Sequence, residues 1–276
     1  MSGTSTGGGA GPWAADENWR PRLAALDVDG TLVDWDNRMT DAVRETVREL
    51  ADSGVEIVIS TGRAIPGVMD AAAKLGLESG IAVASNGAVV HTYSPVDVVH
   101  TVTFDASEAV RRVLEHVPDA LVAVEEIGVG YRVNAPFPDW EIDGTVTIED
   151  VDALVAEPVT RVIIRAVDHD PDEFGDLVHG LGLAEVNYNI GYTAWLDIAP
   201  EGVSKASGLE VVCGRLGIER ADVLAVGDGM NDYDMLRWAG RGVAMGQGSQ
   251  ELKAVADDVT GTVNDDGLVT ELGRWL

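Results

Sequence analysis

Short apolar runs that end in polar, glycine-containing turns recur through the first part of the chain. The runs Leu23–Val28, Val55–Ser60 and Ile81–Ser85 each have the length and apolar character of a buried strand. Apolar positions at helical spacing lie between them: one helix begins after Thr40 as its N-cap, and another follows the second strand. Strands that alternate with helices in this way predict βαβ units and a parallel sheet.

The middle of the chain has a different pattern. Its strand-like runs are separated by longer polar joints, and only two amphipathic helical patterns lie among them. This mixture predicts an α+β unit, an open sheet that carries helices on one face. The expected strands are Val98–Phe104, Ala120–Glu125, Thr160–Val167 and Val186–Asn189, and the expected helices are Ala106–Val117 and Asp172–Leu181.

The alternation of strands and helices then resumes. The expected helices are Ser204–Leu216, Asp232–Ala239, Gln250–Ala256 and Leu268–Leu276, and the expected strands are Val223–Val226 and Val243–Met245. We therefore predict an α/β fold: a Rossmann-like core of residues 21–88 and 192–276, interrupted by an inserted domain of residues 89–191. Residues 1–20 are rich in Gly, Ser and Thr and predict a flexible leader, with Trp13 and Trp19 exposed to solvent.

The charge of the chain narrows the function classes. Nineteen Lys and Arg against 47 Asp and Glu give a formal net charge of -28, which excludes nucleic-acid or membrane-surface binding by bulk electrostatics. No apolar run approaches the roughly 20 residues of a membrane span, and no signal peptide is visible. The single cysteine, Cys213, excludes an intramolecular disulfide and a multi-cysteine metal site. We expect a cytoplasmic protein, either a monomer or a homodimer.

The basic residues are unevenly chosen. Only Lys74, Lys205 and Lys253 are lysines, and the other sixteen basic residues are arginines. Abundant acid with scarce lysine favours a halophilic origin, because high salt screens the self-repulsion of such a surface. The alternative is an ordinary acidic cytoplasmic protein, against which the scarcity of lysine argues.

Four polar motifs follow predicted strands or open a predicted helix. They are Asp27–Thr31 (DVDGT), Ser60–Arg63 (STGR), Lys205 at a helix start, and Gly227–Asp232 (GDGMND). In open parallel sheets, ligands bind just beyond the carboxyl ends of the strands. The sequence therefore predicts that these motifs meet at one edge of the sheet.

Each motif suggests a particular chemistry, and each also has an alternative interpretation in which its residues have only a structural role. Asp27 and Asp29 suit a hard cation, and an Asp is also a nucleophile toward phosphorus; an acid-rich turn is the alternative. Backbone amides around Gly62 suit a phosphate oxygen, but a helix N-cap explains the motif as well. Lys205 offers a point charge for phosphate, or is a solvated residue at the helix start. Asp228 and its neighbours in the last motif would complete a Mg²⁺ shell, a more specific pattern.

In this order, the four motifs resemble the signature motifs of the haloacid dehalogenase superfamily of phosphotransferases. The segment Ser85–Ala88 (SNGA) and the large insert resemble its Cof-type branch, whose cap is called C2. The resemblance covers residues 22–276. It implies a parallel-sheet core with a cap that closes over it, and archaeal phosphoglycolate phosphatases resemble the chain in motif order.

The resemblance also implies roles for individual residues. Asp27 would attack the phosphate, and Asp29 would be the general acid and base. Mg²⁺ would be held by Asp27, the main-chain carbonyl of Asp29, Asp228, and Asp232 directly or through water. The implied phosphate- or substrate-binding residues are Thr61, Gly62, Lys205, Asn231, Arg63 and Asn86. Candidate cap residues for substrate contacts are Glu125, Glu126, Tyr131, Arg132, Asn134, Arg161, Arg165, Asn187 and Tyr188.

The function these motifs predict is Mg²⁺-dependent hydrolysis of a small phosphorylated metabolite, such as a sugar phosphate or phosphoglycolate, through an aspartyl-phosphate. Asp29 at the acid/base position favours ester hydrolysis, but it does not separate a phosphatase from a phosphomutase of the same superfamily. A non-enzymatic phospho-receiver or binding module is the second alternative. The insert and the Gly227–Asp232 motif argue against a receiver.

Overall fold

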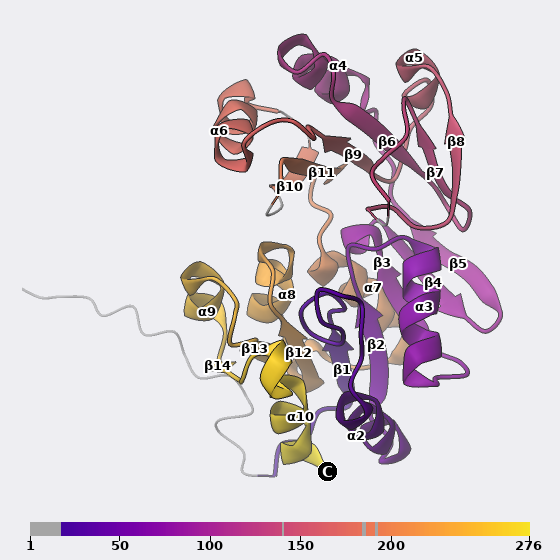
Figure 1. The fold of residues 1–276 in the computed structure, drawn as a ribbon. Coiled ribbons are helices and arrows are strands. Elements are labelled where there is room, and N and C mark those ends of the chain that lie inside the picture. Colours follow the sequence, from indigo (N-terminus) through magenta and orange to yellow (C-terminus); the bar gives the residue numbers. More distant parts are fainter. Residues whose placement is uncertain (1–17, 140, 184–185, 191–192) are drawn as a thin grey trace, which may run out of the picture.

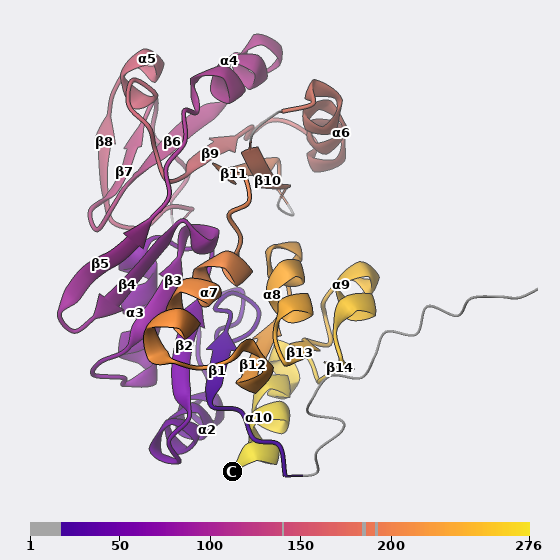
Figure 2. The ribbon, with the colours of Figure 1, turned by 180° about the vertical axis from the view of Figure 1, so that it is seen from behind.

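The computed structural model consists of two units, a larger one built on a mostly parallel sheet and a smaller one above it (Figure 1; Figure 2 shows the reverse side). The structure describes residues 18–139, 141–183, 186–190 and 193–276, and only the backbone of residues 186–190. Among these residues, no helix has the length and apolar character that crossing a membrane requires.

The larger unit contains an eight-stranded sheet. Six neighbouring strands are parallel, and β4 and β5 extend one edge in antiparallel fashion. In spatial order the strands are β14 (Asp258–Val259), β13 (Arg241–Ala244), β12 (Val223–Gly227), β1 (Leu23–Leu26), β2 (Glu56–Ser60), β3 (Ile81–Ala84), β4 (Val89–Tyr93) and β5 (Val96–Thr101). The strand that carries the first motif, β1, therefore lies inside the sheet with a parallel neighbour on each side.

Helices cover both faces of this sheet. One face packs on α2 (Asp41–Asp52), α3 (Ile65–Leu75) and α10 (Gly267–Leu272), and the other on α7 (Lys205–Leu216), α8 (Tyr233–Trp238) and α9 (Gln250–Val255). Alternate residues of β1 enter opposite cores: Ala24 belongs to the first cluster and Leu23 to the second. Burial on both faces explains why the strands read as continuous apolar runs. The predicted α/β core with a parallel sheet is confirmed.

The smaller unit is an inserted α+β cap with a six-stranded sheet, as predicted. Its strands, in spatial order, are β10 (Val186–Ile190), β11 (Trp195–Pro200), β9 (Val162–Arg165), β6 (Leu121–Glu126), β7 (Gly130–Val133) and β8 (Thr145–Ile148). Its helices are α4 (Ser107–His116), α5 (Val151–Leu154) and α6 (Pro171–Leu181), and their apolar residues pack on one sheet face. The helices lie on the side away from the core, so the other sheet face is turned toward it (Figure 1).

The chain passes between core and cap at other positions than the predicted domain boundaries at 88/89 and 191/192. The strands β4 and β5 pair with the core strand β3, although we assigned their residues to the insert. The strand β11 pairs with β9 and β10 of the cap, although we assigned it to the core. Apolar pattern reveals that a strand exists, but partner choice depends on tertiary packing. The short β8 was also missed: Val146 and Ile148 alternate with threonines, but the strand is only four residues long and all of them are exposed.

The expectation that Trp19 is exposed is wrong, whereas Trp13 and residues 1–17 of the expected leader lie outside the described residues. Only 8% of Trp19 is exposed. Its ring meets that of Trp275 edge to face at 5.0 Å between centroids, and its Nε1 donates to the carbonyl oxygen of Ala221 at 3.0 Å. This contact between distant parts of the chain gives the indole a packing site that local sequence pattern does not reveal.

We expect Trp19→Ala to lower the free energy of unfolding by about 3 kcal/mol, because truncation of a buried aromatic ring leaves a cavity and an unpaired carbonyl. Urea denaturation followed by circular dichroism measures this change. The matched control is Leu276→Ala, since Leu276 is 54% exposed, and it should change stability by less than about 0.5 kcal/mol. Equal effects of the two variants would contradict the packing role of Trp19.

Candidate active site

The carboxyl ends of β1, β2 and β12 and the first turn of α7 meet at one edge of the core sheet. Asp27 follows β1, Thr61 follows β2, Asp228 follows β12, and Lys205 is the first residue of α7. All four side chains are buried. The predicted convergence of motifs arises because parallel strands present all their carboxyl ends to the same edge.

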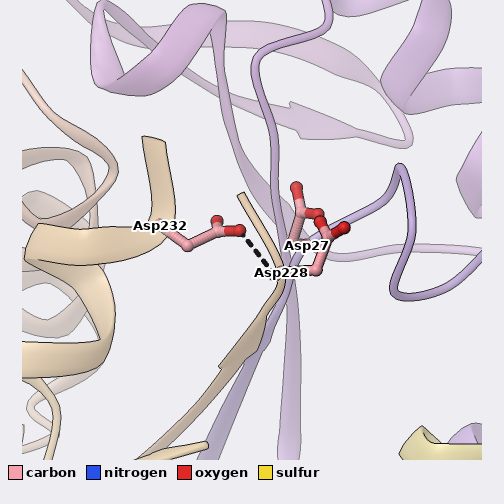
Figure 3. Close-up of side chains that lie close together, drawn as sticks. All are labelled: Asp27, Asp228 and Asp232. Carbon is pink, nitrogen blue, oxygen red and sulfur yellow. Dashed lines mark hydrogen bonds between the residues drawn. The ribbon is translucent and has the colours of Figure 1, made fainter. Parts of the chain in front are cut away.

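Three carboxyl groups, those of Asp27, Asp228 and Asp232 (Figure 3), and the ammonium group of Lys205 form the centre of this site. Carboxylate oxygens of Asp27, Asp228 and Asp232 lie within 4.8 Å of one another. The Lys205 Nζ donates to Oδ1 of Asp27 and to Oδ1 of Asp232, both at 2.6 Å. The second oxygen of Asp232 accepts from the backbone amides of Asp228 and Gly229, both at 2.9 Å. Asp232 therefore binds Lys205 through one carboxylate oxygen and fixes the backbone of its own loop through the other.

The charges at this centre do not balance. Burial, followed by the repulsion of Asp232, raises the pKa of Asp27 well above its ordinary value, although Lys205 opposes the shift. The same two causes raise the pKa of Asp228 to about 7. Burial alone would lower the pKa of Lys205, but Asp232 and Asp27 outweigh it and raise that pKa. One cation thus faces three buried carboxyl groups, and an oxygen-seeking divalent cation fits this donor set.

Two glycines permit the close approach of these groups. Gly30 has a φ of +77°, and a Cβ built there would lie 2.3 Å from Oδ2 of Asp228. Gly87 has a φ of +104°, and its Cβ would lie 2.0 Å from the carbonyl oxygen of Ser204. Ser204 is the N-cap of α7, so the turn at Gly87 lies directly against the helix start that carries Lys205. A side chain at either position would displace part of the site.

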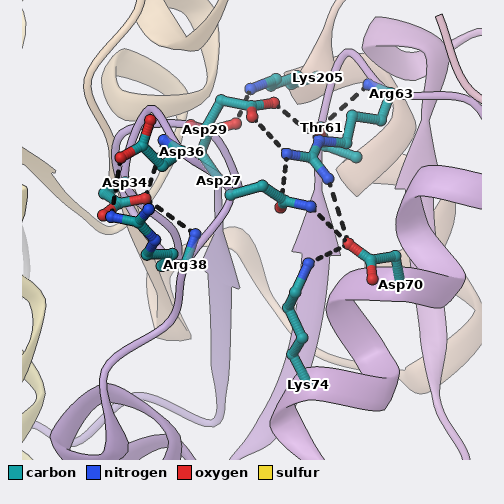
Figure 4. Close-up of polar contacts among 11 residues, drawn as sticks. Asp27, Asp29, Asp34, Asp36, Arg38, Thr61, Arg63, Asp70, Lys74 and Lys205 are labelled. Atoms are coloured by element: carbon teal, nitrogen blue, oxygen red, sulfur yellow. Dashed lines mark hydrogen bonds and ion pairs between the residues drawn. The ribbon is translucent and has the colours of Figure 1, made fainter. Parts of the chain in front are cut away.

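Asp29 has a different environment from Asp27 (Figure 4). Its side chain is 50% exposed and is bound by Arg63 through two contacts, Nε to Oδ2 at 3.0 Å and a terminal nitrogen to Oδ1 at 2.5 Å. Arg63 also donates to Asn37 at 3.1 Å, and its backbone amide donates to Oγ1 of Thr61 at 3.1 Å. The arginine therefore fixes the direction of the Asp29 carboxylate while leaving it in contact with solvent.

Asn86 connects the core site to the cap. Its Nδ2 donates to Asp197 of β11 at 3.1 Å, and its Oδ1 accepts from Nδ2 of Asn231 at 3.0 Å. Asp197 in turn receives two hydrogen bonds from Arg161, at 2.8 and 2.6 Å, and Arg161 donates to the hydroxyl of Tyr131 at 2.8 Å. A continuous chain of hydrogen bonds thus runs from the Gly227–Asp232 loop to the cap sheet.

A cavity of about 820 Å³ lies between core and cap. Asp27, Asp29 and Asp228 line its core side, and Tyr131, Arg161 and Trp195 are among the residues that line its cap side. Its volume is that of a pocket for a small organic molecule. The nucleophile candidate Asp27 therefore faces a space that can hold a substrate.

Comparison with known proteins identifies the family. The sequence model of the haloacid dehalogenase-like hydrolases matches residues 24–272, nearly the whole chain. The chain belongs to the haloacid dehalogenase-like hydrolases.

Relatives of this hydrolase agree with that assignment. It is 31% identical over 273 residues to 5-amino-6-(5-phospho-D-ribitylamino)uracil phosphatase YitU of Bacillus subtilis, covering 93% of this chain and 98% of the relative. It is 26% identical over 256 residues to a phosphoglycolate phosphatase of Methanothermobacter thermautotrophicus, covering 92% and 99%. The predicted enzyme class, a phosphoric monoester hydrolase of this superfamily, is confirmed.

Solved structures show the same fold. A haloacid dehalogenase-like hydrolase from B. subtilis matches with a TM-score of 0.79 at 22% identity, covering 92% of this chain and all of that chain. The family model confirms the superfamily prediction, and this structural match confirms the Rossmann-like core with an inserted cap.

Every residue predicted for the site of this hydrolase lies at the described sheet edge or beside it, but sequence reasoning missed two participants. Gln247 donates to the carbonyl oxygen of Gly30 at 2.6 Å and to Asp228 at 3.3 Å. Its position just after β13, another strand of the same edge, was the available signal. Asp197 was missed although it interrupts the apolar run of β11, where a buried acid needs a partner.

The cap candidates have different surroundings: Asn134 bonds to the backbone of Val122 and Ala120, and Glu126 is exposed and does not line the cavity. Tyr131 and Arg161 line the cavity. Glu125 is buried and accepts from Ser85 and Thr160, both at 2.8 Å, so it binds the core turn rather than a substrate. Arg132 and Arg165 form ion pairs with Glu149 and Glu141. The side chains of Asn187 and Tyr188 lie outside the described residues.

We expect Asn86→Asp to lower kcat/KM by about tenfold, because a carboxylate placed against Asp197 would repel it and weaken the connection between core and cap. Steady-state kinetics with p-nitrophenyl phosphate measure the change. The matched control is Asn264→Asp, which makes the same substitution at an exposed residue away from the cavity. Unchanged kinetics in Asn86→Asp would show that this connection does not support turnover.

Proposed function

We propose that this hydrolase is a Mg²⁺-dependent phosphatase that hydrolyses a small phosphorylated metabolite through an aspartyl-phosphate on Asp27. The observation that carries the proposal is the position of Asp27, a buried carboxyl group at the floor of the cavity and 2.6 Å from the Lys205 ammonium. A cation next to the nucleophile reduces its repulsion by an anionic phosphate.

The two aspartates of the first motif then share the chemistry. An oxygen of Asp27 forms a bond to phosphorus while the ester P–O bond breaks, and Asp29 gives its proton to the departing oxygen. Asp29 next removes a proton from a water molecule, whose oxygen attacks phosphorus and releases inorganic phosphate from Asp27. Exposure suits Asp29 for proton exchange, and the two contacts from Arg63 hold it in one direction.

The excess of buried carboxyl groups supports Mg²⁺ as the ion, because carboxylate oxygens suit a hard divalent cation. In this proposal the ion is held by Asp27, Asp228 and the main-chain carbonyl of Asp29. Both oxygens of Asp232 already accept hydrogen bonds, which favours contact through water for that residue. When bound, Mg²⁺ supplies Lewis-acid stabilisation of the phosphoryl charge.

The remaining polar groups surround the place of the phosphoryl group. Lys205 and Thr61 would bind its oxygens together with the backbone amide of Gly62, and Asn231 would bind it or orient the lysine. Arg63 and Asn86 lie near the entrance in this proposal. Their hydrogen bonds to Asp29 and Asp197 make them positioning residues as much as binding residues.

We expect purified protein to hydrolyse p-nitrophenyl phosphate with Mg²⁺ and to lose at least about 95% of that rate in excess EDTA, because the buried acids then lack a compensating ion. Release of p-nitrophenol and of inorganic phosphate measures turnover. Re-addition of Mg²⁺ should restore it. Full activity in EDTA would show that turnover does not require a metal ion.

The same assay separates the alternatives. A phosphomutase would pass the phosphoryl group to a second substrate hydroxyl instead of releasing phosphate, and a phospho-receiver would stop after one phosphoryl group per chain. Repeating the assay across KCl concentrations tests the proposed adaptation to high salt, which predicts that activity and stability rise with KCl. A cytoplasmic location remains part of the proposal.

The names of the relatives suggest two substrate types, a ribitylaminouracil phosphate and phosphoglycolate. Their leaving groups differ in charge, since the first is uncharged and the second carries a carboxylate. We propose that the substrate of this chain is a small phosphorylated metabolite, and a sugar phosphate and phosphoglycolate are the two candidate types to be distinguished.

A further inference from the structure

The part of the cavity that lies away from Asp27 is rich in acids. Four carboxyl groups beyond the central site line the cavity: Asp36 in the core, and Glu141, Asp143 and Asp197 in the cap. Against them, Arg63 and Arg161 are the only cationic side chains among the described lining residues. We call this part of the cavity lining the outer wall. Its charge affects which leaving group the cavity accepts, and the inference drawn from it rests on the proposed phosphatase function.

Both lining arginines are already held by carboxylates. Arg161 is bound to Asp197 through two hydrogen bonds of 2.8 and 2.6 Å, and it is buried. Arg63 is bound to Asp29 through two contacts in the same manner. A planar guanidinium that binds one carboxylate through two hydrogen bonds has little capacity to bind a second carboxylate, because the pair of N–H donors that matches a carboxylate is already occupied.

The acids are less completely compensated than the arginines. Glu141 pairs with Arg165 and Asp36 pairs with Arg38, two arginines that do not line the cavity. Asp143 has no hydrogen bond or ion pair to any described side chain, and it is exposed. Its charge contributes to the raised pKa of Arg63. The wall therefore presents a net negative charge to anything bound beyond the phosphoryl group.

Aromatic surface completes this wall. Trp35 from the core and Trp195 from the cap both line the cavity, and so does Tyr131, whose hydroxyl accepts a hydrogen bond from Arg161. Rings of this kind favour contact with flat or polyhydroxylated groups and bring no positive charge.

We infer that the physiological leaving group is an uncharged polyhydroxyl or heteroaromatic group, and that a carboxylate on the leaving group is selected against. A second negative charge would lie among Asp143 and the other wall acids without a cation to receive it. The central site accepts the phosphoryl charge because Lys205 and the metal are there, but the outer wall has no equivalent.

Matched pairs of phosphate esters that differ in one group test this inference. The pairs are 2-hydroxyethyl phosphate against 2-phosphoglycolate, and glucitol 6-phosphate against 6-phosphogluconate, in which a CH₂OH group replaces the carboxylate. Each ester is measured as a substrate by phosphate release and as a competitor of p-nitrophenyl phosphate, so that a binding constant is obtained even without turnover. We expect the uncharged member to be favoured at least about tenfold in both pairs at 0.1 M salt.

Two variants assign the preference to the wall. Asp143→Asn removes the one wall carboxylate that has no ion pair with a described side chain. It should reduce the preference for the uncharged ester over the carboxylate ester by about threefold. Asp152→Asn, an exposed acid of the cap that does not line the cavity, is the matched control and should leave the preference unchanged. Equal or better binding of the carboxylates by the wild type overturns the inference, and so does an unchanged preference in Asp143→Asn. Failure to hydrolyse p-nitrophenyl phosphate would instead overturn the proposed function.

Discussion

Asp27→Asn is expected to lower kcat for p-nitrophenyl phosphate by about 10³-fold or more, because a carboxamide does not attack phosphorus. The substitution keeps the size of the side chain and removes one of three crowded carboxyl groups. Since Lys205 keeps its bond to Asp232, the fold should persist. Thermal unfolding of the variant in EDTA measures this, and its Tm should lie within a few degrees of the wild-type value.

A direct observation of the intermediate strengthens this test. Rapid acid quenching of the wild type during turnover should trap phosphate on Asp27, whereas the variant should trap none. The matched control is Asp34→Asn, which changes another acid of the same loop that does not line the cavity. If Asp27→Asn retains turnover near the wild-type rate, the nucleophile is a different group.

Lys205→Met is expected to lower the free energy of unfolding by about 3 to 5 kcal/mol in EDTA and to lower kcat by at least about 100-fold. The lysine is fully buried and is the only cation in contact with Asp27 and Asp232 among the described residues. Methionine fills a similar volume without charge, so the loss reports the uncompensated carboxyl groups rather than a cavity. Urea denaturation and steady-state kinetics measure the two effects.

A double variant separates charge compensation from packing. In Lys205→Met with Asp232→Asn, the amide oxygen can still accept from the backbone amides of Asp228 and Gly229, and one uncompensated charge is gone. We expect the double variant to be more stable than the sum of the two single effects, by at least about 1 kcal/mol. Strict additivity would show that the ion pair between Lys205 and Asp232 does not stabilise the fold.

The parts of the site that were predictable from the sequence are those that depend on chain direction. Asp27, Thr61 and Asp228 each follow a buried parallel strand, and strands of one sheet bring their carboxyl ends together whatever their exact order. Thr40 was likewise identified as an N-cap, and its hydroxyl accepts from the Val43 amide at 3.2 Å. Such features need only local sequence and one rule of topology.

The connections between core and cap needed three-dimensional information. Asn86 reaches Asp197 across 111 positions of sequence, and nothing in the sequence around either residue marks the pair. The prediction that placed the residues of β4 and β5 in the insert was wrong for a similar reason, because an edge strand of the core and a strand of the insert have the same apolar pattern. Partner choice in sheets depends on what else is packed nearby.

The burial of Lys205 has a consequence for chemical modification of the protein. Amine-reactive reagents need an accessible, deprotonated amine, and Lys205 has neither property, since it is fully buried and its pKa is raised. Lys74 and Lys253 are then the only lysines left for acylation, and both are only partly exposed. They lie at the end of α3 and within α9, both on the core. Coupling to a dye or a solid support through lysine would therefore leave the cap unmodified.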